Sequence, residues 1–409
     1  MKECKKVAII GAGAAGYFAA LSVAQHHPNA EVTLYEKTAK VLSKVKISGG
    51  GRCNVTHNCN ELSELLKAYP RGGRKLKSIF YQFNPKDTVN WFKERGVAIK
   101  AEADGRMFPV SDQSQTIIDC LAAAVDKQAI TLQLSTGVKA LKQEKGKWII
   151  VLANQERVYD NVIVTTGGNP KRSSFDWLAQ QGHKIIPPVP SLFTFNMPEE
   201  NITALMGVVA PNGKVSIAGT KIKTEGPILV THWGLSGPAV LKASAFGARI
   251  LAEKNYCFDV QIGWVDQNPK ELLSLFEKTV SVHPHKKIMN HNPLELPNRL
   301  WHYLLERTRV PQDRRWNELG LKNSRRLIEY LTNDLYKVNG KTTFKEEFVT
   351  CGGVSLSDVD LNTMESKKAK GLYFAGEVLD IDAITGGYNF QAAWSSGYVA
   401  GKLGEKLAK

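Results

Sequence analysis

A glycine-rich turn that follows directly on a short apolar run constrains the fold of this chain more than any other feature. Val7-Ala8-Ile9-Ile10 has the β-branched, apolar composition of a strand that is buried on both faces. Gly11-Ala12-Gly13-Ala14-Ala15-Gly16 follows it, residues 17–25 are rich in Ala and Leu and predict a helix, and a second strand is expected over 31–35. This order predicts a dinucleotide-binding unit in a doubly wound, Rossmann-like α/β fold.

Each glycine of this turn has a physical role in such a unit. Gly11 permits the tight turn, Gly13 lets the backbone approach a pyrophosphate, and Gly16 allows the helix to pack closely on the strand. Glu36 lies twenty residues after Gly16, where a carboxylate accepts hydrogen bonds from ribose hydroxyls and repels a 2′-phosphate. The cofactor-binding residues expected here are Gly11, Gly13, Ala14, Ala15, Gly16, Glu36 and Lys37.

A second glycine-rich stretch begins at Ser48. Three consecutive glycines, Gly49 to Gly51, lose considerable chain entropy on folding, which is explained if a ligand approaches the backbone closely. An ordinary surface turn is the alternative. The residues expected to contact the cofactor in this stretch are Ser48, Gly49, Gly50, Gly51, Arg52, Cys53 and Asn54.

The motif SGGGRCN at 48–54, together with the N-terminal fingerprint, resembles the BaiN-type or aminoacetone-oxidase-type family of FAD-binding flavoproteins. The elements GRMFP at 105–109 and THWGLSGP at 231–238 and the last sixty residues are also similar to this family. The resemblance implies non-covalent FAD, and it allows both the oxidation of aminoacetone-like amines and the reduction of unsaturated cyclic compounds.

Further cofactor contacts follow from this resemblance. A strand over 158–164 is expected to end in Thr166, Gly167 and Gly168, which pass the chain back under the FAD, and Val138 occupies the position of main-chain contacts to the adenine. The sequence departs from the family directly afterwards, at 169–175, where the usual glycine-rich continuation is missing. Contacts that relatives make there are therefore not carried over to this chain.

The third segment lies near the C-terminus. Gly376 and Glu377 end an apolar run, and the resemblance makes Glu377 a ligand of the ribityl hydroxyls, with Asp380 and Asp382 as alternatives. A helix is expected to begin at Gly387-Tyr388-Asn389-Phe390, with its N-terminus at the flavin. Two glycines at 386–387 keep this end of the helix bare, so that its N–H groups are available to an acceptor.

The region between the second and third segments is expected to form insertions. We predict an FAD-binding domain from 1–190 and 341–409, a β-rich domain at 191–265 to which 336–345 return, and a helical insert at 266–335. The sequence does not identify a catalytic acid or base, and the two candidates are His232 and Tyr388. It has no spacing typical of metal ligands.

Six cysteines without regular spacing indicate a reducing compartment, and hence the cytoplasm. Cys53 and Cys59 have five residues between them rather than the four of disulfide reductases, so a packing role is favoured over a dithiol relay. The N-terminal apolar run superficially resembles a secretory signal, but its glycine pattern favours a folded unit. No other stretch is long and apolar enough to span a membrane.

The predicted function is that of an FAD-dependent oxidoreductase, which transfers hydride to or from FAD on a small organic substrate. Only one dinucleotide fingerprint is present, so the redox partner is O₂ or an NAD(P)H that visits the flavin transiently. The formal charge of +15 and the basic pairs at 286–287, 314–315 and 325–326 leave an alternative, a nucleic-acid-associated flavoprotein whose FAD is structural or sensory. The intervening acids disfavour nucleic acid as a partner, and a homo-oligomer is compatible with the sequence.

Overall fold

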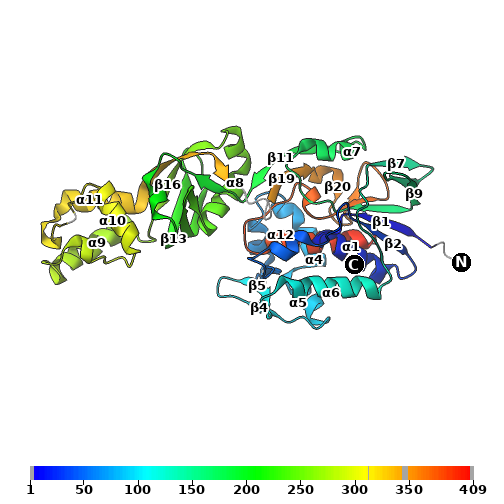
Figure 1. The fold of residues 1–409 in the computed structure, drawn as a ribbon, viewed down its shortest axis with the longest axis horizontal. Helices are drawn as coiled ribbons and strands as arrows, with labels where there is room; N and C mark the ends of the chain where they lie inside the picture. Colours follow the sequence, from blue (N-terminus) through cyan, green and yellow to red (C-terminus); the bar gives the residue numbers. More distant parts are fainter. Residues whose placement is uncertain (1–3, 312, 343–348, 406–409) are drawn as a thin grey trace. The chain divides into compact units, whose positions relative to one another are not determined.

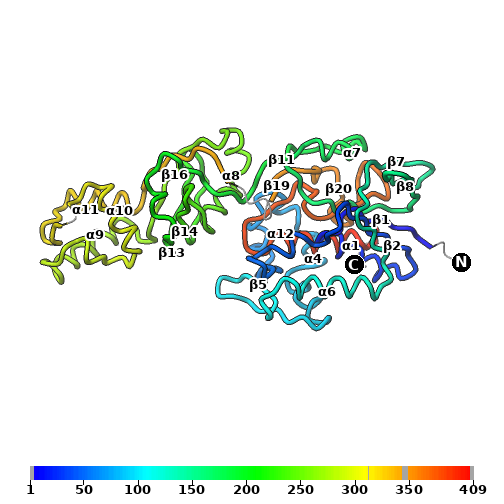
Figure 2. The backbone as a smooth tube through the Cα atoms, viewed as in Figure 1, coloured from blue at the N-terminus to red at the C-terminus, as the bar shows by residue number. Residues whose placement is uncertain are grey.

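The computed structural model of the chain describes residues 4–311, 313–342 and 349–405 (Figure 1). It divides into two compact units, of which unit 1 comprises Met1–Ser191 and Lys345–Lys409 and unit 2 comprises Leu192–Phe344. The first and last parts of the chain, blue and red in Figure 2, therefore belong to the same unit. In the described sequence, no helix is long and apolar enough to cross a membrane.

Unit 1 is built on a seven-stranded sheet. From one edge to the other its strands are β20 (Val359–Asp360), β21 (Glu365–Ser366), β22 (Leu372–Phe374), β10 (Asn161–Val164), β1 (Lys6–Ile10), β2 (Glu31–Tyr35) and β6 (Thr131–Gln133). Five consecutive strands, from β22 to the edge strand β6, run parallel. The first two strands are antiparallel. The buried apolar residues of β1, β10 and β22 are typical of strands that are covered on both faces.

Three small sheets accompany this large one. They are β3 (Thr56–His57) with β5 (Arg106–Pro109) and β4 (Ile99–Ala101), β7 (Ala140–Glu144) with β8 (Lys147–Val151) and β9 (Glu156–Tyr159), and β11 (Ile185–Ser191) with β19 (Val349–Val354). The single strand expected over 158–164 is two strands. Asp160 separates them, because its N–H and its carboxylate both bond the backbone of Lys6, and β9 and β10 join different sheets.

The helices of unit 1 include two that lie against each other along their length, α1 (Ala14–His26) and α12 (Tyr388–Gly401). A Cβ at Gly397 would lie 2.5 Å from the Ala15 carbonyl oxygen, so the two backbones approach as closely as only glycine permits. The remaining helices are α2 (Ser43–Ile47), α3 (Leu62–Lys67), α4 (Lys77–Gln82), α5 (Pro85–Lys93), α6 (Ser114–Lys127) and α7 (Asp176–Ala179).

Unit 2 contains a second seven-stranded sheet, which is antiparallel throughout. Its order is β17 (Asp334–Asn339), β16 (Cys257–Gly263), β13 (Val209–Ile217), β14 (Lys223–Thr231), β15 (Gly234–Ser236), β12 (Thr194–Asn196) and β18 (Lys341–Thr342). Its helices are α8 (Pro238–Glu253), α9 (Pro269–Val282), α10 (Asn298–Arg307) and α11 (Gly320–Asn333).

One hydrophobic core runs through both the sheet and the helices of unit 2, from Phe195 and Val260 to Trp301 and Trp316. The separation of a helical domain from a β-rich domain therefore stays a prediction. β17 begins within the expected helical insert, and β18 pairs with β12 of unit 2. Residues 341–342 thus extend the sheet of unit 2.

Candidate functional site

The N-terminal fingerprint forms the turn from β1 into α1. Gly13 is the residue that precedes the helix, no side chain caps this helix end, and no acidic residue lies in its first turn. The first N–H groups of α1 are thus available to an anion, as at other phosphate-binding helix ends. Packing requires glycine at positions 11 and 16. A Cβ at Gly11 would lie 2.6 Å from the Thr165 oxygen, and one at Gly16 would lie 1.9 Å from the Gly11 oxygen.

Gly13 differs from these two glycines. Its backbone is extended, with φ of −93°, and an added Cβ would meet no atom of the described residues within 4 Å. Packing within the protein therefore does not require glycine here. The open space above Gly13 is what a pyrophosphate would fill, and on this observation the residues fit a dinucleotide such as FAD.

Glu36 lies at the end of β2 beside this turn, as the fingerprint predicts. Its carboxylate accepts hydrogen bonds from the Ala12 N–H at 3.1 Å and from the Thr38 N–H and hydroxyl at 2.9 Å each. The Glu36 carbonyl accepts the Thr136 N–H at 2.8 Å, and Gly137 lies against the side chain of Lys37. The structure therefore brings Glu36, Lys37 and the segment that contains Val138 together, although Val138 itself lies outside a strand.

The second glycine stretch turns in a left-handed conformation. Gly49, Gly50 and Gly51 have φ of 60°, 68° and 83°, and a Cβ at either of the last two would meet none of the described residues within 4 Å. The Arg52 side chain is directed elsewhere, because it pairs with Glu102 at 2.6 Å and lies over the Phe108 ring. Any contact of Arg52 with the cofactor would therefore come from its backbone.

Cys53 is fully buried, and burial raises the pKa of its thiol to about 12. Burial also raises the pKa of Cys59, and both thiols are free. A reactive thiol needs a low pKa and access to solvent, so Cys53 acts as a packed core residue.

Three of the sequence motifs meet at His57. Its Nδ1 lies 3.0 Å from the Gly386 oxygen, its ring stacks on Tyr388 at 4.5 Å between centroids, and a Cβ at Gly105 would lie 2.5 Å from its Nε2. Asn54 also links the second and third segments. With its amide oriented so that the nitrogen donates to the Thr56 oxygen, its side-chain oxygen accepts the Gly387 N–H at 3.0 Å. His57 was not among the candidates from the sequence, because its role is visible only in its contacts with residues that are distant in the sequence.

The third segment supplies a second bare helix end. Gly387, with φ of 89°, precedes α12, and no side chain caps the helix or adds an acid to its first turn. A Cβ at Gly387 would lie 2.5 Å from the Thr56 oxygen. The Asn389 side chain accepts the Ala383 N–H at 2.9 Å and donates to the Ala383 oxygen at 3.2 Å. The Phe390 ring stacks on Trp394. These two residues therefore offer backbone N–H groups at the helix end rather than their side-chain amide or ring edge.

Glu377 follows Gly376 in a short 3-10 turn at 376–378. Its carboxylate accepts the Thr350 N–H at 2.7 Å and the Lys44 ammonium at 2.6 Å, and a Cβ at Gly168 would lie 2.7 Å from it. The loop at 166–168 thus reaches the third segment. The role of Glu377 as a ribityl ligand stays a prediction.

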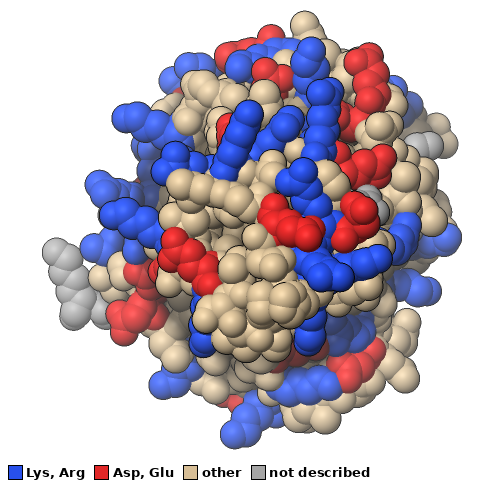
Figure 3. Space-filling view, turned by 90° about the vertical axis from the view of Figure 1, so that its left-hand side faces the viewer, with Lys and Arg blue, Asp and Glu red and all other residues tan. Residues whose placement is uncertain are grey.

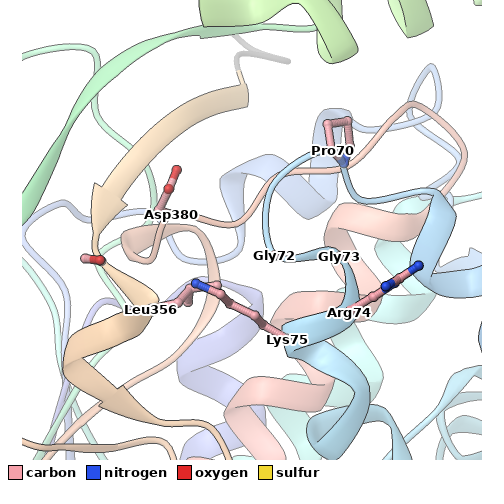
Figure 4. A pocket seen from close by; sticks show the side chains of 8 residues that line it. Pro70, Gly72, Gly73, Arg74, Lys75, Leu356 and Asp380 are labelled. Atoms are coloured by element: carbon pink, nitrogen blue, oxygen red, sulfur yellow. The ribbon is translucent and has the colours of Figure 1, made fainter.

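The two alternative acids have other surroundings. Asp382 is fully buried, pairs with Arg71 and accepts the Ser191 hydroxyl at 2.6 Å, and burial raises its pKa despite the Arg71 charge. Asp380 lines a pocket of about 320 Å³ together with Pro70, Gly72, Gly73, Arg74, Lys75, Ser355 and Leu356 (Figure 4). Asp382 therefore has a structural role in the fold, whereas Asp380 is one of the residues that line this pocket.

His232, the other catalytic candidate, lies in unit 2 on the exposed turn between β14 and β15, with its ring against Trp233. The glycines of its motif are required by packing, since a Cβ at Gly234 would lie 2.1 Å from the Phe195 oxygen and one at Gly237 2.7 Å from the Pro227 oxygen. This motif therefore has a structural explanation within unit 2. Tyr388 remains the candidate that lies among the predicted cofactor residues.

Comparison with known proteins places this arrangement in a family. The family described as "HI0933-like protein Rossmann domain" matches residues 5–403. Three relatives are similar over nearly the whole chain. A "ribosomal RNA dihydrouridine synthase" of Escherichia coli is 30% identical over 95% of this chain and 95% of its own. A "3-dehydro-bile acid delta(4,6)-reductase" of Clostridium scindens is 28% identical over 97% and 98%. A "ribosomal RNA dihydrouridine synthase" of Haemophilus influenzae is 29% identical over 97% and 98%.

The match confirms the Rossmann-like fold and the flavoprotein resemblance that the motifs predict. It likewise confirms the prediction of an enzyme. The chain belongs to the HI0933-like family and is an FAD-dependent oxidoreductase.

Proposed function

We propose that this enzyme reduces a carbon–carbon double bond conjugated to a carbonyl group, with NAD(P)H as the reductant. The observation that carries the proposal is the bare N-terminus of α12, which the Asn54 and His57 contacts fix beside the second glycine stretch. The names of the relatives support the choice of substrate. A bile-acid reductase that acts on 3-dehydro compounds and a dihydrouridine synthase both add hydrogen across a double bond conjugated to a carbonyl.

The net reaction takes one NAD(P)H, one proton and the unsaturated substrate to NAD(P)⁺ and the saturated product. FAD, when bound, supplies the hydride chemistry. The carbon of the double bond farther from the carbonyl gains the hydride equivalent, and the nearer carbon gains the proton. The chain has one dinucleotide fingerprint, and we assign this fingerprint to FAD. NAD(P)H therefore has no Rossmann domain of its own and binds transiently.

The chain's own groups bind and orient the cofactor. The first N–H groups of α1 bind the pyrophosphate, and Glu36 binds the adenosine ribose. The N–H groups of Tyr388, Asn389 and Phe390, together with the dipole of α12, stabilise negative charge at the helix end. The open turn at Gly50 and Gly51 leaves room for a flat ring system.

Tyr388 is the candidate for delivery of the proton. Burial raises the pKa of its phenol, so the proton stays on the oxygen at neutral pH. Its hydroxyl makes no hydrogen bond to a residue that the structure describes, whereas its main-chain oxygen is held by the Tyr69 hydroxyl at 2.7 Å. The ring is fixed by its stack on His57. Tyr388→Phe is therefore expected to slow product formation at least tenfold and to leave flavin reduction by NAD(P)H unchanged.

RNA is a second candidate substrate, because two of the relatives are named for their action on ribosomal RNA and the excess of 54 Lys and Arg over 39 Asp and Glu attracts polyanions. Uracil in RNA contains the required double bond conjugated to a carbonyl. The RNA candidate and the small-molecule candidate share the same chemistry at the flavin, and they differ in what holds the substrate.

An anaerobic experiment tests the proposed reaction. The holoenzyme is reduced with NADH or NADPH and then mixed with a cyclic conjugated ketone, with a uridine-rich RNA, or with air-saturated buffer. Reoxidation of the flavin by an unsaturated substrate, with a product two mass units heavier, supports the reductase. Rapid reoxidation by O₂ alone, with stoichiometric hydrogen peroxide, would identify an oxidase instead.

A further inference from the structure

Two loops of unit 2 bring together basic residues that are nearly thirty positions apart in the sequence. Lys287 and Arg315 form an isolated antiparallel bridge. The Ile288 N–H donates to the Arg314 oxygen at 2.9 Å, and the Trp316 N–H donates to the Lys286 oxygen at 3.1 Å. We call Lys286, Lys287, Arg314 and Arg315 the basic loop pair.

The backbone of the basic loop pair is anchored in the core of unit 2. Ile288 and Trp316 are fully buried, and the Trp316 indole donates to the His291 oxygen at 3.1 Å. The side chains of Lys286, Lys287 and Arg315 are exposed, and that of Arg314 is half-buried. A fixed backbone thus presents several cations at one place on the surface.

The four side chains have no carboxylate within ion-pair distance among the described residues. None of the four forms an ion pair with any Asp or Glu that the structure describes, in contrast to Arg106 and Lys44 of unit 1, which pair with carboxylates at 2.7 and 2.6 Å. The acids near them in sequence are Asp313 and Glu318. The Glu318 carboxylate accepts a hydrogen bond from the backbone N–H of Arg315 at 3.0 Å. It does not pair with the Arg315 guanidinium.

The titration of a neighbouring histidine is consistent with this local charge. Partial burial, followed by the charges of Lys286 and His283, lowers the pKa of His291. The rings of His283 and His291 lie 4.4 Å apart. The charge of Lys286 therefore acts on the imidazole of His291.

The helix that follows the second loop, α11, carries further exposed cations. Lys322, Arg325 and Arg326 are exposed on α11, where Glu329 is also exposed, and Figure 3 shows Lys and Arg interspersed with Asp and Glu on this face. An array of this kind attracts a chain of regularly spaced negative charges more strongly than it attracts a single anion.

We infer that the basic loop pair binds the phosphate backbone of RNA. The inference rests on the RNA candidate of the proposed function, and it deepens that candidate by naming the surface that holds the RNA. Lys supplies point charges to phosphates, and the planar guanidinium of Arg can contact two phosphate oxygens at once. These contacts position RNA without reading its sequence.

The test uses the full-length holoenzyme and a fluorescein-labelled, uridine-rich single-stranded RNA, with binding followed by anisotropy at several salt concentrations. The variants are Lys286→Gln/Lys287→Gln and the same pair combined with Arg314→Gln/Arg315→Gln. Lys221→Gln/Lys223→Gln is the matched control, because it removes two exposed charges from the β13–β14 hairpin of the same unit. Flavin content and the rate of flavin reduction by NAD(P)H are measured for every protein.

We expect the variant with all four substitutions to bind RNA at least tenfold more weakly. The slope of log K against log salt should become shallower by about 2 to 3. The control should bind within about twofold of the wild type, and flavin reduction should be unchanged throughout. Equal binding by the variant with all four substitutions, an equal loss in the control, or stronger binding of the wild type to anionic vesicles or duplex DNA than to RNA would overturn the inference. RNA binding is read without turnover, so a failure of the proposed reductase reaction is distinguished from a failure of the surface.

Discussion

Gly13→Ala should separate the demands of the cofactor from those of the fold. The alanine can adopt the observed φ of −93° without strain, and its Cβ meets none of the described residues within 4 Å. The free energy of unfolding of the FAD-free protein should therefore change by less than about 0.5 kcal/mol. The methyl group would instead occupy the space assigned to the pyrophosphate.

The expected loss of FAD affinity follows from the contacts that the methyl group displaces. A hydrogen bond from a backbone N–H to a charged oxygen contributes about 1.5–3 kcal/mol. Loss of one such bond weakens binding roughly ten- to a hundredfold, since 1.4 kcal/mol corresponds to a factor of ten. A second displaced bond would increase the effect.

The assay titrates FAD into the FAD-free protein by quenching of flavin fluorescence and measures urea unfolding of the same preparation. Gly16→Ala is the control, because a Cβ there would lie 1.9 Å from the Gly11 oxygen and should destabilise the fold itself. Unchanged FAD affinity in Gly13→Ala, or a loss of stability as large as that of the control, would refute the assignment of this turn to the pyrophosphate.

Four further predictions concern single positions. Glu36→Ala should weaken FAD binding by about 1–3 kcal/mol, which equilibrium dialysis measures. Cys53→Ser should keep the rate of flavin reduction within about tenfold in stopped-flow traces, because a thiol with a pKa of about 12 is not ionised at neutral pH; a larger loss would point to a thiol relay. Gly387→Val should empty the FAD site or lower the flavin reduction potential, and unchanged values of both would place the end of α12 away from the flavin. Arg71→Met should destabilise unit 1 by about 3–5 kcal/mol, since it leaves Asp382 buried without its cation, and Asp382→Asn in the same chain should restore part of this in thermal unfolding.

The parts of the fold that depend on short stretches could be predicted from sequence. The fingerprint from β1 to Glu36 and the start of α12 after Gly387 were predicted because glycine spacing and apolar runs are local signals. The split of the expected strand at Asp160 could not be predicted, since it depends on hydrogen bonds to Lys6, which lies 154 positions away in the sequence.

The assembly of the candidate site was harder to predict than its pieces. The glycine stretches near residues 50 and 387 each suggested a ligand, but the contact of His57 with Gly386 spans 329 positions. The family motif around His232 suggested a functional role, whereas its glycines serve packing within unit 2. The pairing of Lys287 with Arg315 was likewise invisible, because basic pairs alone do not show that two loops meet.

Hydrogen–deuterium exchange with and without FAD tests most directly whether the separated segments form one cofactor site. We expect protection on FAD binding at residues 11–16, 36–38, 48–54, 136–138, 166–168 and 376–390, with little change in the sheet and helices of unit 2. Protection confined to the N-terminal turn, or strongest within 192–342, would contradict the convergence of the three segments on one FAD.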